Sequence, residues 1–214
     1  GGLIFAPLLL WLDLPPAQAL ATSSFAIVPT AMAGTITHLR GGHLPVRPGL
    51  AIGLSAFASA VLFGGLAGMV PEWTLLAMQT LMYVVLAIAV RARDEETTEE
   101  PDPSVSPFLL AGGGCLAGWS AGMLGLGGGL VMVPLMAGPL KMPIHLAVRL
   151  STLAVLCSAS AASLQFVHEG RGLPWVGLML GAVAAVAAWW TSSRLDQFDA
   201  GLLVKLLRGL AVVL

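Results

Sequence analysis

Glycines are the residues whose type and spacing most clearly suggest chemistry in this sequence. Five of them fall within eight residues at Gly122–Gly129, in "GMLGLGGGLVMVPLM", and a wholly apolar run containing Pro134 follows. Glycine adopts the left-handed dihedrals that end one helix and start another. A helix that starts near Gly129 would direct free N–H groups and the positive end of its dipole at its surroundings. Anion binding is the chemistry that such a place favours.

The glycine element occurs twice. "GGLIFAPLLL" at Gly1–Leu10 has the same shape as "GGLVMVPLMA" at Gly128–Ala137, and Pro7 falls on Pro134. An isolated glycine-rich stretch in an apolar segment usually serves close helix packing. Duplication before a proline favours a broken-helix site instead. We therefore predict that the glycines at both places bind the substrate: Gly1, Gly2, Gly127, Gly128 and Gly129.

Hydroxyl side chains follow each glycine element at matching positions. "ALATSSFAI" at Ala19–Ile27 aligns with "AVRLSTLAV" at Ala147–Val155. Hydroxyl donors suit an anion that must bind without being trapped. Their alternative role is hydrogen bonding between helices or back to the i−4 carbonyl. The repeated placement favours binding, so we expect five of them to contact the substrate: Thr22, Ser23, Ser24, Ser151 and Thr152.

Two ionisable residues in apolar segments are further candidates. Arg149 lies near the start of "IHLAVRLSTLAV", where a guanidinium could hold an oxyanion through two hydrogen bonds. The alternative is an interfacial arginine that extends to the membrane surface. His38, near the end of its segment, titrates in the range that would couple transport to protons. An interfacial histidine without such a role is the alternative there.

Other patterns give no enzymatic or metal site. "GWSAG" at Gly118–Gly122 matches the G-x-S-x-G nucleophile elbow, but Ser120 lies in an apolar helix, whereas the elbow needs a strand–turn–helix. No histidine pair has metal-ligand spacing, and carboxylates are nearly absent from the apolar segments. We expect no metal and no cofactor. Cys115 and Cys157 lie in apolar segments and imply no disulfide framework.

Composition places the chain in a membrane. Hydrophobic residues make up 57% and charged residues 10% of the 214 residues, against roughly 25% charged in soluble domains. The mean hydropathy is +0.90. Six of the 11 acidic residues lie in one run at Asp94–Asp102. Runs of about 20 apolar residues mark transmembrane helices. We predict a polytopic, all-α bundle, with segments near 17–39, 49–69, 73–91, 107–125, 128–140, 144–167, 174–193 and 199–214.

The chain divides into two halves. Residues 1–92 form the first repeat, 93–106 an acidic linker that contains prolines, and 107–214 the second repeat. "GGHLPV" at Gly41–Val46 aligns with "GRGLPW" at Gly170–Trp175, which extends the similarity between the two halves over some 45 residues. By the positive-inside rule the loops at 40–48 and 91–107 are cytoplasmic. Basic residues of the second half flank the opposite loops, which favours inverted rather than parallel repeats.

The glycine run must interrupt a helix. Pro107 to Leu140 would be about 50 Å long as one helix, whereas the hydrocarbon core is roughly 30 Å thick. We therefore expect a discontinuous helix that enters the membrane and returns. The backbone groups freed by the break are tolerated only against protein or a water-filled cavity.

At these residues the chain resembles the sulfite exporter TauE/SafE family. The resemblance rests on "GGGLVMVPLM" and "GGLIFAPLLL", on "ALATSS" and "AVRLST" after them, and on "GTITHLRGG" in the first half. It covers nearly the whole chain. In the family pattern a helix and a glycine precede Gly1, so we expect the sequence to be a piece of a longer protein. Arg149 and Leu150 replace Ala21 and Thr22 of the first repeat, so the two half-sites are expected to differ.

This resemblance implies a secondary transporter that exports small sulfur-containing anions, such as sulfite or sulfonates. Internal repeats suit alternating access with a site near the midplane. An anion channel in the same cavity is one alternative, and an intramembrane serine hydrolase using Ser120 is another. The expected partners are a small anionic substrate and membrane lipid, with no nucleic acid, and a second copy of the chain as a candidate in a homodimer. We expect location in a bacterial-type inner membrane.

Overall fold

A computed structural model describes residues 2–42, 44–91, 107–137, 140 and 142–194. These residues form helices and no strand, which confirms the predicted all-α class. Gly1, the linker and the segment predicted at 199–214 lie outside the described residues. The helices are α1 (Gly2–Trp11), α2 (Pro16–Arg40), α3 (Val46–Ala67), α4 (Glu72–Arg91), α5 (Pro107–Leu124), α6 (Gly129–Ala137), α7 (Ile144–His168) and α8 (Pro174–Ser193).

Prolines mark where the long helices begin. Pro15 and Pro143 precede α2 and α7, and Pro174 is the first residue of α8. A proline suits this place because its missing N–H has no partner at the start of a helix and its φ is already helical. Four helices of the described part are long and apolar enough to cross a membrane: α2, α3, α7 and α8.

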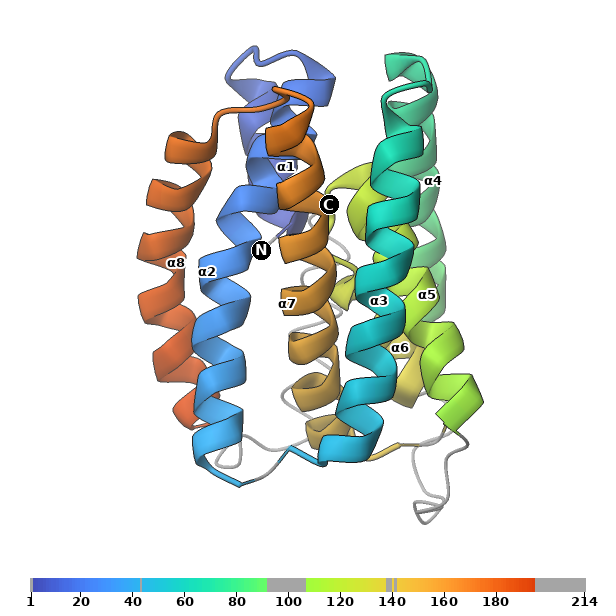
Figure 1. The fold of residues 1–214 in the computed structure, drawn as a ribbon, viewed down its shortest axis with the longest axis vertical. Helices are drawn as coiled ribbons and strands as arrows, with labels where there is room; N and C mark the ends of the chain where they lie inside the picture. Colours follow the sequence, from blue (N-terminus) through green and yellow to red (C-terminus); the bar gives the residue numbers. More distant parts are fainter. Residues whose placement is uncertain (1, 43, 92–106, 138–139, 141, 195–214) are drawn as a thin grey trace.

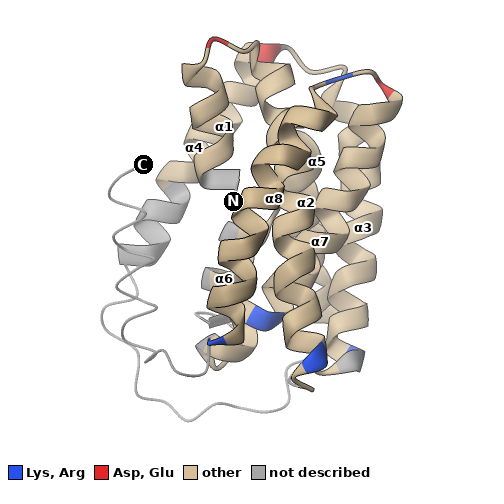
Figure 2. Ribbon diagram, turned by 90° about the vertical axis from the view of Figure 1, so that its left-hand side faces the viewer, with Lys and Arg blue, Asp and Glu red and all other residues tan. Residues whose placement is uncertain are grey.

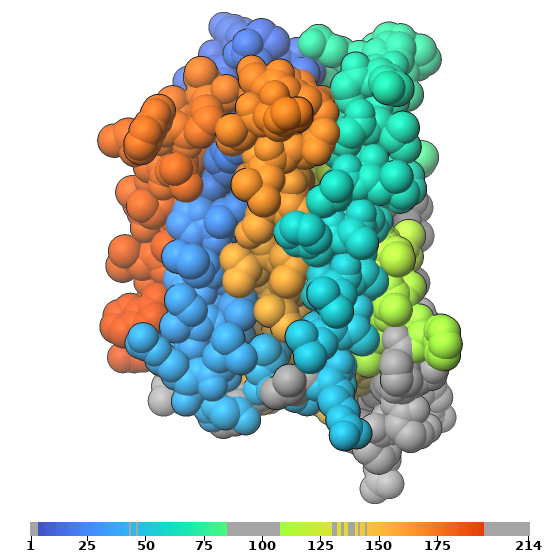
Figure 3. Space-filling model, viewed as in Figure 1, coloured from blue at the N-terminus to red at the C-terminus, as the bar shows by residue number. Residues whose placement is uncertain are grey.

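The four long helices lie side by side along the long axis of the molecule (Figure 1 and Figure 3). α7 lies between α2 and α3, α8 packs on the outer side of α2, and α5 packs on α3. α2 and α8 run from the upper end to the lower end of Figure 1, and α3 and α7 run the opposite way. α1 rises from the middle of the molecule, whereas α6 descends from the middle.

Glycines allow two of these helix pairs to approach closely. A Cβ added to Gly118 of α5 would lie 2.3 Å from the Ala56 carbonyl oxygen of α3. A Cβ added to Gly181 of α8 would lie 2.3 Å from the Ala26 carbonyl oxygen of α2. Such distances leave no room for a side chain, as in other membrane helix pairs with small residues at the interface. Part of the glycine content therefore serves packing.

Charge separates the two ends of the bundle (Figure 2). Figure 2 shows Asp and Glu at the upper end of the described chain and Lys and Arg mainly at the lower end. Arg171 lies at the upper end, in the connection between α7 and α8. The helix directions place Arg40, Arg47, Arg149 and Arg194 at the lower, basic end. The positive-inside rule assigns this end to the cytoplasm. We therefore expect the end of α2 and the start of α7 to face the cytoplasm.

Candidate functional site

The glycine run separates α5 from α6. α5 ends at Leu124 and α6 begins at Gly129. Gly125, Gly127 and Gly128 have φ values of 63°, 71° and 67°. A residue with a Cβ is strained at such dihedrals, by about 1–2 kcal/mol each. The backbone leaves the helix where the sequence concentrates glycine, in the middle of the bundle (Figure 1).

The interrupted backbone is held by its neighbours. The Ser23 hydroxyl of α2 donates a hydrogen bond to the Gly125 carbonyl oxygen, 2.9 Å away. A Cβ added to Gly125 would lie 2.3 Å from the Leu20 carbonyl oxygen, and one added to Gly128 would lie 2.5 Å from the Ala117 carbonyl oxygen. The break is therefore enclosed by protein, as backbone away from water requires.

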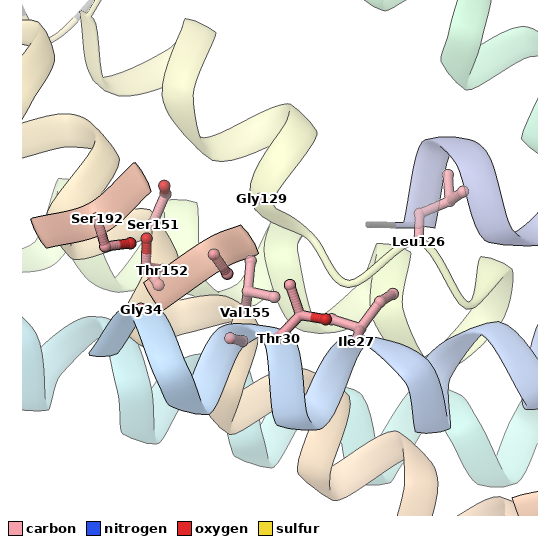
Figure 4. Close-up of a pocket in the computed structure, with 11 residues that line it drawn as sticks. Ile27, Thr30, Gly34, Leu126, Gly129, Ser151, Thr152, Val155 and Ser192 are labelled. Carbon is pink, nitrogen blue, oxygen red and sulfur yellow. The ribbon is translucent and has the colours of Figure 1, made fainter. Parts of the chain in front are cut away.

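A cavity of about 270 Å³ lies beside the start of α6 (Figure 4). Four hydroxyl side chains supply its polar groups: Thr30, Ser151, Thr152 and Ser192. The other lining residues are glycine or apolar: Ile27, Ala31, Gly34, Leu126, Gly129, Val155 and Ala188. α2, α7, α8 and the interrupted backbone thus meet here, and none of the described lining residues is charged.

The cavity hydroxyls are positioned by their own helices. Thr152 Oγ1 and Ser151 Oγ donate to the Val148 carbonyl oxygen at 2.7 and 2.8 Å. Thr30 Oγ1 donates to the Ala26 carbonyl oxygen at 3.0 Å. These carbonyls also accept helical N–H groups, so rotation of χ1 can redirect a hydroxyl at little cost. Each side chain can therefore present either lone pairs or its O–H to a molecule in the cavity.

The structure brings only some of the predicted site residues together. Ser151, Thr152 and Gly129 line the cavity. Gly127 and Gly128 lie in the break, where an added Cβ would meet Ile27 or Ala117. Gly2 begins α1 and is not a lining residue, and Gly1 lies outside the described residues.

The hydroxyls of the first half have structural contacts instead. Thr22, Ser23 and Ser24 are at most 1% exposed and do not line the cavity. Thr22 Oγ1 accepts a hydrogen bond from the backbone N–H of Leu173, 3.0 Å away, directly before α8 begins. Ser24 Oγ donates to the Leu20 carbonyl oxygen at 3.3 Å. In this conformation the two predicted hydroxyl groups do not share one site.

Replacing Thr22 by valine should lower the stability of the protein. Leu173 N–H would lose its acceptor, and the loss of a hydrogen bond of this kind costs about 0.5–1.5 kcal/mol. We expect Thr22→Val to lower the midpoint of thermal unfolding in detergent. Thr37→Val is the control, because Thr37 Oγ1 donates only to the Ala33 carbonyl of its own helix. Equal midpoints for the two variants would contradict the role assigned to Thr22.

The two ionisable candidates lie outside the cavity lining. Arg149 is half-buried on α7, two residues before Ser151. His38 is 4% exposed and lies one helical turn beyond Gly34 on α2. Substrate binding by Arg149 and proton coupling by His38 remain predictions.

Eight of the described lining residues were not predicted from the sequence, among them the hydroxyl-bearing Thr30 and Ser192 and the small Gly34. Helical spacing places Ile27, Thr30 and Gly34 on one stripe of α2. That stripe gives no signal in the sequence, because the rest of the helix is also apolar. Ser192 enters through the packing of α8 on α2, which no motif indicates.

The long apolar helices, the interrupted helix at mid-depth and the uncharged cavity define an integral membrane protein of the transporter class. The family model described as "Sulfite exporter TauE/SafE" matches residues 1–214. The chain belongs to this family and is a membrane transporter of the TauE/SafE type. This assignment also indicates a transporter rather than an enzyme.

A curated relative is the "Probable membrane transporter protein ORF9" of a Sinorhizobium species, which is 28% identical over 110 residues. The match covers 51% of this chain and 42% of the relative, so the chain spans less than half of that protein in the aligned part. No solved structure matches the chain.

Proposed function

We propose that the protein exports small sulfur-containing anions by alternating access through the hydroxyl-lined cavity. The observation that carries this proposal is the position of the cavity, beside the first residue of α6 and next to a glycine-interrupted backbone in the middle of the bundle (Figure 4). The helix N-terminus supplies N–H groups and a positive dipole end.

The lining suits a mobile anion better than a cation. A cation site would need carboxylates, and none occurs among the described lining residues. Hydroxyl donors bind an oxyanion without the strength of an ion pair, so the anion can leave again. The cavity volume of about 270 Å³ lies just below the usual range for small-molecule sites. A compact oxyanion fits this space better than a large metabolite.

Helix lengths support two inverted repeats. α1 and α6 have 10 and 9 residues, with Pro7 and Pro134 each the sixth residue of its helix. α2 and α7 have 25 residues each. α3 and α8 have 22 and 20 residues. The members of each pair run in opposite directions (Figure 1). Gly42 and Gly170 both have a φ of 67° and therefore correspond to each other. The sequence comparison of the two halves instead aligns Gly41 with Gly170.

The first test is flux of radiolabelled sulfite into proteoliposomes. The liposomes should hold the complete protein, and sulfate, sulfoacetate, thiosulfate and acetate should compete. We expect saturable flux that sulfur oxyanions inhibit and acetate does not. No flux with folded, correctly inserted protein would contradict the cargo assignment.

The same assay separates the alternatives. A channel would conduct without saturation or counter-transport, whereas a carrier saturates and exchanges. A serine hydrolase would need Ser120, which is fully buried in the last turns of α5 and donates to the Ala117 carbonyl oxygen at 3.0 Å. Ser120→Ala should therefore leave flux nearly unchanged.

A further inference from the structure

The packing between the two halves of the chain is mirrored. On α3, a Cβ added to Gly49 would lie 3.0 Å from Leu153 of α7, and one added to Gly53 would lie 3.1 Å from Cys157 of α7. On α8, a Cβ added to Gly177 would lie 2.5 Å from Phe25 of α2, and one added to Gly181 would lie 2.5 Å from Pro29 of α2. In each of these pairs of contacts, the residues of the two halves are separated by the same number of residues along the chain. The cavity residues of α2, α7 and α8 therefore have defined counterparts on α7, α2 and α3.

The counterparts of the cavity residues lie in a closed region. The α2 residues Thr30 and Gly34 correspond to Ser158 and Ala162 of α7. The α7 residues Ser151 and Thr152 correspond to Ser23 and Ser24 of α2, and Ser192 of α8 corresponds to Gly64 of α3. The three serines and Ala162 are at most 1% exposed. A Cβ added to Gly64 would lie 3.3 Å from Gln165 Cγ of α7. The same types of small and hydroxyl side chains are thus present on both sides, and the described ones of the second region are buried.

Side chains at the acidic end close this second region. Arg171 Nη2 donates to the Gly64 carbonyl oxygen at 3.2 Å. Arg171 also forms an ion pair with Glu169 and lies over the Phe166 ring, 4.9 Å from its centroid. Phe166 packs in turn with Ala162, Ala21 and Phe25. We call the Glu169–Arg171 ion pair together with the hydrogen bond from Arg171 to Gly64 the Arg171 latch, because it fastens the end of α7 to α3.

A second observation concerns a pair of buried hydroxyls. Ser163 Oγ is buried and has no hydrogen-bond partner among the described residues. The same holds for its counterpart, Thr35 Oγ1, which directly follows Gly34 of the cavity. A buried hydroxyl without a partner is unfavourable. Water that enters the second region would supply a partner for Ser163.

We propose that Ser23, Ser24, Ser158, Ala162 and Gly64 form the second half of the anion path, which opens toward the acidic end when the Arg171 latch separates. The inference rests on the proposed function, because it assigns the half of the path that is closed in this conformation. The cavity on the cytoplasmic side would close as the second half opens, since α2 and α7 take part in both.

Thiol labelling from opposite sides of the membrane tests this assignment. In a background with Cys115→Ser and Cys157→Ala, we would introduce Thr30→Cys, Ser158→Cys or Leu164→Cys singly. A charged, membrane-impermeant methanethiosulfonate would be applied to right-side-out and inside-out vesicles. Leu164 is the control, because it is 65% exposed on α7 and faces away from the other helices.

We expect Thr30→Cys to react from the cytoplasmic side and Ser158→Cys to react, more slowly, from the acidic side. Arg171→Ala should raise the Ser158→Cys rate about five- to tenfold, because an ion pair, a hydrogen bond and a ring contact are lost. The Leu164→Cys rate should stay at background. Ser163→Cys gives a second probe of the same region if Ser158→Cys fails to fold.

Two outcomes would overturn the inference. One is flux-competent protein in which neither Ser158→Cys nor Ser163→Cys reacts from the acidic side, even with Arg171→Ala. The other is reaction of both from the cytoplasmic side. If Thr30→Cys reacts from the cytoplasmic side and Ser158→Cys from the acidic side, but no sulfur anion is transported, the second half of the path is supported and the proposed substrate is contradicted.

Discussion

Gly128→Leu is expected to abolish transport while the protein still inserts into the membrane, and Gly128→Ala is expected to reduce flux at least about tenfold. A Cβ at this position would lie 2.5 Å from the Ala117 carbonyl oxygen and 2.6 Å from the Ala117 Cβ. The φ of 67° adds strain to the clash, of about 1–2 kcal/mol. α5 and α6 must then move apart, and the start of α6 leaves the cavity. Radiolabelled flux per inserted protein measures the effect.

Gly42→Ala is the matched control for Gly128→Ala. Gly42 has the same φ of 67°, but an added Cβ would meet nothing within 4 Å. The control therefore carries the backbone strain without the clash, and we expect its flux to be close to wild type. Equal losses in the two variants would mean that strain alone explains the effect. Normal flux in Gly128→Ala would contradict the assignment of the interrupted backbone to the transport site.

Removing the cavity hydroxyls of α7 should have the second large effect. Thr152→Val keeps the shape of the side chain, and Ser151→Ala adds little space, so the double variant changes mainly polarity. A hydrogen bond to a charged group contributes about 1.5–3 kcal/mol, and each 1.36 kcal/mol is a factor of about ten. We expect the half-saturating substrate concentration to rise at least about tenfold. The concentration dependence of flux is the measurement.

Thr80→Val controls for loss of a back-bonded hydroxyl. Thr80 Oγ1 donates to the Leu76 carbonyl oxygen of α4 at 2.9 Å, as Thr152 does to Val148, but Thr80 is exposed and does not line the cavity. We expect its half-saturating concentration to be unchanged. An unchanged value in the Ser151→Ala, Thr152→Val variant as well would show that α7 does not contact the anion.

Local signals in the sequence predicted most of the described helices, but no predicted segment covers α1 at Gly2–Trp11. The segments expected at 144–167 and 174–193 are α7 at Ile144–His168 and α8 at Pro174–Ser193. Prolines and glycines act within a few residues of their own position, so their effect is readable without knowledge of the fold. The same reasoning located the chain reversal near Gly125–Gly128, where three glycines have positive φ.

The site was only partly predictable, because it depends on which apolar helices face each other. Ser151 and Thr152 were found through their place after the glycine element, and both line the cavity. Ser192 reaches the cavity because α8 packs on α2, and no polar face in either helix indicates this packing. Thr22 directly precedes Ser23 and Ser24, the counterparts of the site hydroxyls, yet its partner is the N–H of Leu173, far along the chain. A motif specifies residue types, and helix packing decides their partners.

The uncharged lining of the cavity has an electrical consequence. If no described side chain of the cavity neutralises the cargo, an anion that crosses alone carries its charge through the membrane potential. Each charge moved through 100 mV is worth about 2.3 kcal/mol. A cell interior that is negative therefore drives the anion outward, from the basic end to the acidic end. Under the proposed function, and if His38 does not couple transport to protons, the resting voltage alone gives export its direction.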